Sequence, residues 1–354
     1  MKLSVITGTG SFIPSIKKEN TNFNNHVFLN ADGTSFDNPN PIIIEKFKSI
    51  TGIEERRYAK DEYKASDLGY FAAKKAIEDA NINPEELDYI IFAHNFGDVK
   101  KDAIQSDILP SLATRVKYLL QIENPNCVAY DILFGCPGWV EGVIQAQAFI
   151  KAGIAKKCLV IGGETLSRVV DINDRDSMIY SDGAGACIVE ATDKNDSGIL
   201  SHASQTFTKD EAYYLFFGNS NDKSKDKDVR YIKMHGRKIY EFALNNVPKA
   251  MQTALDKSGV SIDDVKKVFI HQANEKMDEA IIKRFYRLYK KPIPEGVMPM
   301  SIHKLGNSSV ATVPTLLDLV LKGNIENQEV KKGDVIILAS VGAGMNINAI
   351  VYKY

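Results

Sequence analysis

The stretch DILFGCPGW (131–139) places a cysteine where an apolar run ends and a helical pattern begins. Gly135 precedes Cys136, and Pro137 and Gly138 follow it, which favours a tight turn. A cysteine at the start of a helix meets the positive end of the helix dipole and unpaired N–H groups, and both favour the nucleophilic thiolate. The stretch therefore predicts Cys136 as a nucleophile with a lowered pKa. A small buried core cysteine is the alternative interpretation.

Two internal matches indicate a duplicated unit. Residues 135–153 match residues 306–324 at an offset of 171, and residues 76–94 match residues 254–272 at an offset of 178. Matches near half the chain length predict two α/β halves, 1–195 with the nucleophile and 196–354 with two further site residues.

These matches point to His271 and Asn307. Asn307 falls at the position of Cys136 in the other half, after a glycine at the start of a helix. His271 falls at the carboxyl end of a strand, where α/β folds hold their ligands. If the halves pack about a pseudo-twofold axis, the three side chains share one cavity. His271 could then accept or donate a proton, and Asn307 could donate hydrogen bonds to a thioester carbonyl.

Short apolar strands alternate with helical patterns along the chain, which is typical of α/β proteins with a parallel or mixed sheet. The expected strands are 3–10, 89–95, 127–133, 157–164, 186–192, 266–272 and 334–344. The expected helices are 66–81, 138–152, 237–258, 274–290 and 309–322.

The composition excludes several classes of protein. The chain of 354 residues is 44% apolar with a net charge of −1 and a mean hydropathy of −0.19, so no charge excess favours nucleic acid. No signal peptide and no membrane span are expected. The cysteines (Cys127, Cys136, Cys158, Cys187) form no C-x-x-C pair, and the histidines (His26, His94, His202, His235, His271, His303) lack metal-ligand spacing. We therefore expect a reduced, cytoplasmic protein without a metal.

Several segments together resemble the ketoacyl synthase III branch of the thiolase superfamily. They are GTGSFIP (8–14), TGIEERRYA (51–59), DILFGCPGW (131–139), YSDGAGACIVEA (180–191), FIHQAN (269–274), HKLGNSS (303–309) and SVGAGMN (340–346). The resemblance covers the whole chain in order. It implies a thiolase-like αβαβα fold of five layers, built from two duplicated halves and usually homodimeric.

The resemblance also implies the reaction and the role of each residue. Cys136 would take an acyl group from a thioester, and His271 and Asn307 would hold a second thioester and stabilise its enolate. The N–H groups of Cys136 and of the turn at Ala343 and Gly344 would form the oxyanion hole. The product would come from Claisen condensation with a malonyl- or β-ketoacyl-carrier-protein thioester. No cofactor is expected beyond the phosphopantetheine or CoA that carries the substrates.

Some positions depart from the family pattern. Family members that take acetyl-CoA clamp the adenine with Trp and Arg, where this chain has Lys46 and Ile50. Arg168 falls at the position expected for a second clamp residue. The departures favour an acyl carrier protein as donor over CoA. Leu109 replaces the glutamate of the related olefin-forming synthases, which argues against that branch.

The surroundings of the nucleophile favour a modified acyl pocket. Phe134 and Trp139 are bulky residues beside Cys136, and both are predicted to contact substrate, with a core position as the alternative. Residues 24–41 form an insertion rich in turn residues, which predicts a surface excursion or a lid.

The segment after HQAN predicts a docking surface for an acidic acyl carrier protein. Lys276, Lys283, Arg287 and Lys290 are spaced by seven, four and three residues, so they share one helical face near the expected site. A plain solvated face is the alternative.

Other functions fit the same residues less well. A specialised ketosynthase of the dialkylresorcinol or alkylquinolone type, condensing two unusual acyl thioesters, remains the alternative within the resemblance. A Cys-His-Asn hydrolase lacks support because the chain has no local protease signature. A non-catalytic partner subunit is disfavoured because all three site residues are present.

Overall fold

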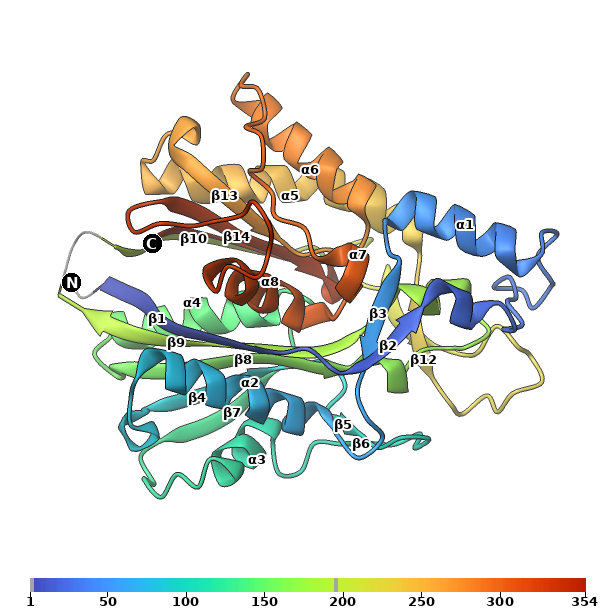
Figure 1. Ribbon diagram of the computed structural model, residues 1–354, viewed down its shortest axis with the longest axis horizontal. Coiled ribbons are helices and arrows are strands. Elements are labelled where there is room, and N and C mark those ends of the chain that lie inside the picture. Colours follow the sequence, from blue (N-terminus) through green and yellow to red (C-terminus); the bar gives the residue numbers. More distant parts are fainter. Residues whose placement is uncertain (1–2, 194–196) are drawn as a thin grey trace.

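The computed structural model, which describes residues 3–193 and 197–354, has two stacked β-sheets that alternate with three layers of helices (Figure 1). The first sheet has the order β1-β9-β8-β4-β7. Its strands are β1 (Leu3–Phe12), β4 (Tyr89–Ala93), β7 (Val128–Ile132), β8 (Lys157–Thr165) and β9 (Asp182–Thr192). The inner strands β4 and β8 run parallel, in a register that pairs Ala93 with Gly162.

The second sheet has the order β10-β15-β14-β13. Its strands are β10 (Gly198–Thr206), β13 (Val265–Ile270), β14 (Val335–Gly342) and β15 (Asn346–Lys353). Strands β13 and β14 are parallel and pair Ile270 with Ala339, whereas the other two pairings are antiparallel.

The central layer consists of α4 (Gly138–Lys151) and α8 (Thr312–Leu321), which lie between the sheets (Figure 1). Both helices are apolar on most sides, and such helices are stable only when buried all round. Their side chains share one core cluster with residues of both sheets, such as Val160 and Leu338. Both central helices are therefore shielded from solvent by a sheet on each side.

The outer layers are amphipathic helices that cover the free faces of the sheets. On the first sheet, α2 (Ala65–Ala80) and α3 (Leu112–Leu119) pack with β4 and β8 into one cluster. On the second sheet, α5 (Gly236–Ser258) and α6 (Glu275–Leu288) form another. The five-layered αβαβα fold expected from the sequence is confirmed by this arrangement.

Shorter elements surround the edge where the site lies. They are β2 (Ile16–Glu19), α1 (Asn40–Thr51), β3 (Glu55–Tyr58), β5 (Asp98–Val99), β6 (Ser106–Asp107), β11 (Leu215–Gly218), β12 (Tyr231–Met234) and α7 (Ile302–Leu305). The insertion packs beside this edge, since Leu29 N–H donates to Asn173 O and Phe36 stacks under Arg175. No helix of the described residues is long and apolar enough to cross a bilayer.

The first sheet and its outer helices use residues 3–192, and the second uses residues 198–353. The division into two duplicated halves between residues 195 and 196 stays a prediction, and this boundary lies outside the described residues.

Candidate active site

Cys136 lies in the turn between β7 and α4, in contact with the turn that ends β14. A Cβ atom on Gly342 would lie 2.4 Å from the Cys136 nitrogen, and a Cβ atom on Gly135 would lie 2.6 Å from the Ala343 nitrogen. Gly135 also has a φ of +67°, which other residues rarely adopt. Glycines at both positions therefore allow the backbones of Cys136 and Ala343 to approach, as an oxyanion hole built from both turns requires.

Cys136 opens into a cavity of about 230 Å³, called the acyl cavity below. Its lining is mostly apolar and consists of Asn95, Phe96, Gly135, Cys136, Leu166, Tyr180, Leu215, Phe216, Phe217, Ile232, Ser309 and Ala343. The rings of Phe96 and Phe217 stack with centroids 5.0 Å apart, and both residues also line a second, wider cavity. The stacked pair therefore lies between an apolar space beside the nucleophile and a larger cavity of about 620 Å³.

Ser309 connects Cys136 with Asn307. The Ser309 hydroxyl donates to the Cys136 sulfur at 3.4 Å, and the Ser309 N–H donates to Asn307 Oδ1 at 2.7 Å. Ser309 adopts a φ of +54°, a left-handed conformation that is costly for a serine. The strained turn directs its N–H toward one site residue and its hydroxyl toward another.

The pKa of Cys136 differs from the expectation drawn from the helix start. Burial raises the pKa of the Cys136 thiol to about 11, and the hydrogen bond from Ser309 acts in the opposite direction. The prediction of a lowered pKa is therefore wrong for the free protein, because loss of solvent outweighs the favourable donors. The thiol is protonated at neutral pH.

His271 directly follows β13, with its N–H bonded to Ala339 O at 2.9 Å. The side chain is buried and its Nδ1 has no hydrogen-bond partner among the described residues. Burial lowers the pKa of His271 to about 4, so the imidazole is neutral at physiological pH. A neutral imidazole carries one N–H donor and one acceptor nitrogen. His271 itself lines neither the cavity at Cys136 nor the cavity at Asn307.

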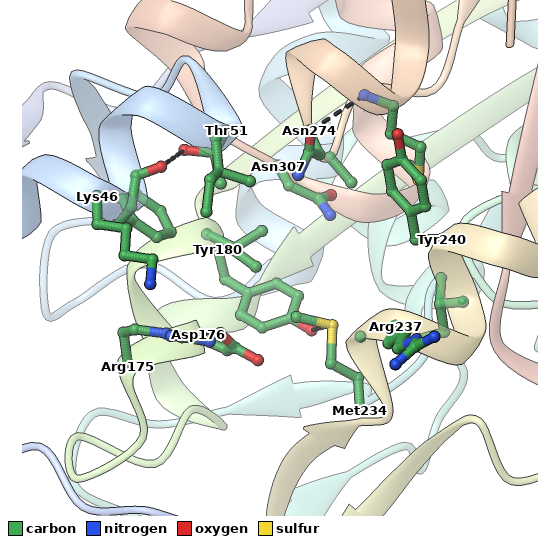
Figure 2. Close-up of a pocket in the computed structure, with 17 residues that line it drawn as sticks. Lys46, Thr51, Arg175, Asp176, Tyr180, Met234, Arg237, Tyr240, Asn274 and Asn307 are labelled. Carbon is green, nitrogen blue, oxygen red and sulfur yellow. Dashed lines mark hydrogen bonds and ion pairs between the residues drawn. The ribbon is translucent and has the colours of Figure 1, made fainter. Parts of the chain in front are cut away.

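Asn307 lines a neighbouring cavity of about 340 Å³, called the access cavity below. Figure 2 shows this cavity, which is lined by Lys46, Phe47, Ile50, Thr51, Arg175, Asp176, Ile179, Tyr180, Met234, Gly236, Arg237, Ile239, Tyr240, Ala273, Asn274, Met277 and Asn307. Ala273 and Asn274 come two and three residues after His271. Tyr180 lines both cavities, so the two cavities share this residue as a common wall.

Two of the three predicted clamp positions line the access cavity. Lys46 and Ile50 line the access cavity with Arg175 and Arg237, so three cations surround it (Figure 2). Arg168 does not line it. The Arg168 guanidinium donates to the backbone carbonyls of Val99, Lys60 and Tyr63. Arg175 and Arg237 are therefore the arginines that line the access cavity, whereas Arg168 lines the second cavity, which Phe96 and Phe217 also line.

Trp139 and Phe134 are placed in the core between the sheets. Trp139 is buried on α4 and its Nε1–H donates to Val160 O at 3.3 Å, while Phe134 packs against the same cluster. Neither lines the acyl or the access cavity. Trp139 points into this cluster from α4, and Phe134 packs against the same cluster from the stretch between β7 and α4.

The predicted docking residues are all exposed. Lys276, Lys283 and Arg287 lie on α6, and Lys290 follows the end of that helix. Lys276 is next to Met277, which lines the access cavity. Lys276, Lys283 and Arg287 therefore follow one face of α6, whereas the prediction that Lys290 shares this face is wrong, because Lys290 lies beyond the helix with a φ of +55°.

Sequence reasoning missed three polar residues that surround the nucleophile, Asn95, Glu164 and Ser309. Asn95 comes two residues after β4 and Glu164 is the last residue but one of β8, so both lie at the carboxyl ends of parallel strands. Polar residues at such strand ends are the signal that could have identified them.

Comparisons with known proteins find relatives along nearly the whole chain. A family model described as 3-oxoacyl-[acyl-carrier-protein (ACP)] synthase III matches residues 130–207, and its C-terminal counterpart matches residues 255–354. The chain is 31% identical to the β-ketoacyl-[acyl-carrier-protein] synthase III of Caldanaerobacter subterraneus subsp. tengcongensis, over 99% of this chain and 97% of that one. It is 33% identical to the Clostridium tetani protein of the same name, over 99% and 98%.

Solved structures are similar over the same length. The 3-oxoacyl-[acyl-carrier-protein] synthase III of Aquifex aeolicus superposes with a TM-score of 0.80 at 31% identity, with both chains covered completely. The OleA protein of Xanthomonas campestris gives a TM-score of 0.80 at 19% identity and so shares the fold.

Proposed function

The chain belongs to the 3-oxoacyl-[acyl-carrier-protein] synthase III family, and we propose how its residues form a carbon–carbon bond from two thioesters. The enzyme is an acyltransferase that works by Claisen condensation. The observation that supports this assignment of residues is the Ser309 turn, which joins the nucleophile in the acyl cavity to the amide in the access cavity.

In the first half-reaction, the Cys136 sulfur attacks the carbonyl carbon of an acyl thioester. The N–H groups of Cys136 and Ala343 stabilise the oxyanion, and the adjacent Gly344 gives the turn its shape with a φ of +74°. The carbon–sulfur bond to the carrier then breaks. The thiol proton of Cys136 leaves with the carrier thiol, and the acyl chain occupies the acyl cavity.

In the second half-reaction, a malonyl thioester enters through the access cavity. His271 and Asn307 donate to its thioester oxygen, so loss of CO₂ leaves a stabilised enolate. The enolate carbon attacks the acyl carbon on Cys136, the carbon–sulfur bond breaks, and the thiolate takes up a proton. The product is a β-ketoacyl thioester. Side chains and backbone N–H groups act in both steps, and phosphopantetheine delivers both substrates.

Incubation with an acyl carrier-protein thioester tests the proposal. Mass spectrometry should find one acyl group on the peptide that contains Cys136, and addition of malonyl carrier protein should yield the β-ketoacyl carrier protein. Rapid release of free acid would indicate a hydrolase, and absence of labelling would indicate a non-catalytic subunit.

An acyl carrier protein is the proposed donor. Lys46 and Ile50 offer no aromatic face for an adenine ring. Three cations line the access cavity (Lys46, Arg175, Arg237) against one carboxylate, Asp176, which pairs with Arg175 at 3.2 Å, while Arg237 pairs with Glu241 outside the lining. Such charge fits the phosphate of a phosphopantetheine arm and the acidic surface of its carrier.

Lys276, Lys283 and Arg287 on α6, with Lys290 beyond the helix, form the proposed docking surface. The double variant Lys283→Glu/Arg287→Glu should raise KM for an acyl carrier protein by roughly fivefold to tenfold at low salt, because both contacts become repulsive. Turnover of a short pantetheine thioester should stay nearly unchanged. Steady-state kinetics with both donors measures the difference.

The double variant Lys151→Glu/Lys156→Glu is the matched control, because these exposed lysines line neither cavity. It should leave both KM values unchanged, and added salt should weaken carrier binding by the parent protein. If KM rises equally for both donors in Lys283→Glu/Arg287→Glu, or rises for neither, α6 is not the docking surface.

A homodimer is proposed from the first sheet. Its strand β7 is an edge strand, and apolar side chains near it are exposed, including Val128, Leu133 and Leu109, the last at 87%. An unpaired edge beside exposed apolar side chains favours pairing with a second copy. Sedimentation equilibrium should show a dimer at micromolar concentration, and a monomer there would contradict this proposal.

A reducing compartment, the cytoplasm, is the proposed location. All four cysteines are free, and Cys127, Cys158 and Cys187 are buried. A buried free thiol is stable where glutathione keeps it reduced.

A further inference from the structure

A chain of hydrogen bonds leads from Cys136 to a buried carboxylate that the reaction above does not use. Ser309 Oγ donates to the Cys136 sulfur at 3.4 Å, and Asn95 Nδ2 donates to Ser309 Oγ at 3.1 Å. The same Asn95 nitrogen donates to Glu164 Oε1 at 2.6 Å. The register of β4 on β8, which pairs Ala93 with Gly162, brings Asn95 beside Glu164.

The direction of these bonds follows from their chemistry. The Asn95 amide nitrogen only donates, so its two hydrogens point to Glu164 and to Ser309. Since the Ser309 oxygen accepts from Asn95, its own hydrogen is free to point at sulfur. An acceptor at Glu164 therefore orients Asn95, and Asn95 orients the hydroxyl that faces the nucleophile.

The charge of Glu164 affects the ionisation of the Cys136 thiol. The residue is 1% exposed, its Oε2 has no partner among the described residues, and burial raises its pKa to about 7. The titratable groups that interact with it are His94 after β4, Asp182 at the start of β9, and Cys136. Ionised Glu164 opposes a negative charge on Cys136 because little solvent screens the two groups.

We propose that Glu164, Asn95 and Ser309 form a positioning chain that sets the reactivity of Cys136. Ser309 stabilises the thiolate as a donor, and the negative charge of Glu164 restrains thiolate formation in the free enzyme. This restraint should protect Cys136 from oxidation before substrate binds, because oxidants attack thiolates rather than thiols. The inference rests on Cys136 being the nucleophile of the proposed function.

Alkylation of Cys136 by iodoacetamide measures thiolate formation without any substrate. Ser309→Ala should slow the reaction at pH 8 by roughly tenfold or more, because a hydrogen bond to a charged sulfur is lost. Ser308→Ala is the matched control, since its hydroxyl faces Thr312 Oγ1 at 3.4 Å and not the sulfur. It should alkylate like the parent protein.

Glu164→Gln keeps an oxygen that accepts from Asn95 and removes the charge. Well below its pKa, a thiol gains about tenfold in thiolate per pH unit. Glu164 of the parent protein ionises between pH 6 and 8, and its negative charge then opposes the thiolate. The alkylation rate of the parent protein should therefore rise by less than tenfold per pH unit in this range. Glu164→Gln should restore the full tenfold gain and alkylate faster above pH 7. Glu164→Leu should alkylate more slowly than Glu164→Gln, because Asn95 loses its acceptor.

The outcomes separate this inference from the proposed function. An unchanged rate in Ser309→Ala, or parallel pH profiles of the parent protein and Glu164→Gln, would overturn the positioning chain even if condensation is observed. The expected alkylation profiles with no acyl-enzyme would support the chain and overturn the proposed reaction.

Discussion

Cys136→Ala is expected to abolish condensation, with a loss on the order of 10⁴-fold or more, because no other group can accept the acyl chain. Thermal unfolding should change little, since the variant removes one sulfur atom that is partly exposed at a cavity. The measurement is formation of β-ketoacyl carrier protein beside a melting curve. Condensation at an unchanged rate would show that the acyl group is held elsewhere.

Selective alkylation is the control for this assignment. Burial raises the pKa of Cys127 to about 11 and that of Cys158 to about 12, and it also raises the pKa of Cys187. Because the pKa of every thiol is raised, access decides which one reacts. Iodoacetamide should label Cys136 first, since the other three are buried in the core. Preferential labelling of any other cysteine would contradict the site.

His271→Ala and Asn307→Ala are expected to separate the two half-reactions. Both variants should still form acyl-Cys136 but lose decarboxylative condensation by roughly 10²-fold or more, the effect of one lost donor to a developing oxyanion. The reason for Asn307 is geometric: its Oδ1 accepts from Ser309 N–H, which leaves its N–H groups for the substrate. Mass spectrometry of the acyl-enzyme and a condensation assay measure the two steps.

The pH dependence gives a second criterion for His271. Its pKa is lowered to about 4, so the imidazole is neutral throughout the range from pH 5 to 8 and gains a proton only below it. Condensation should therefore show no loss from this group until the pH falls toward 4. His202→Ala is the matched control, because His202 lies on β10, at the opposite edge of the second sheet from β13. Equal loss of both half-reactions in His271→Ala would indicate a nucleophile–base pair instead.

Much of the architecture followed from local patterns in the sequence. The α/β class follows from alternating apolar strands and helices, because each pattern determines which face of an element can be buried. The turn at Cys136 and the turn at Asn307 followed from glycines beside a helix start. Such signals involve neighbours in the chain, so one sequence is enough to read them.

The chemistry of the site was decided by contacts between distant segments. Asn95 meets Glu164 across 69 residues and Ser309 across 214, and no local pattern encodes those meetings. The pKa of Cys136 rises because protein from several elements excludes water, which outweighs the helix start that the sequence reveals. Arg175 reaches the access cavity while Arg168, seven positions earlier, is held by backbone carbonyls, because packing decides where a long side chain points.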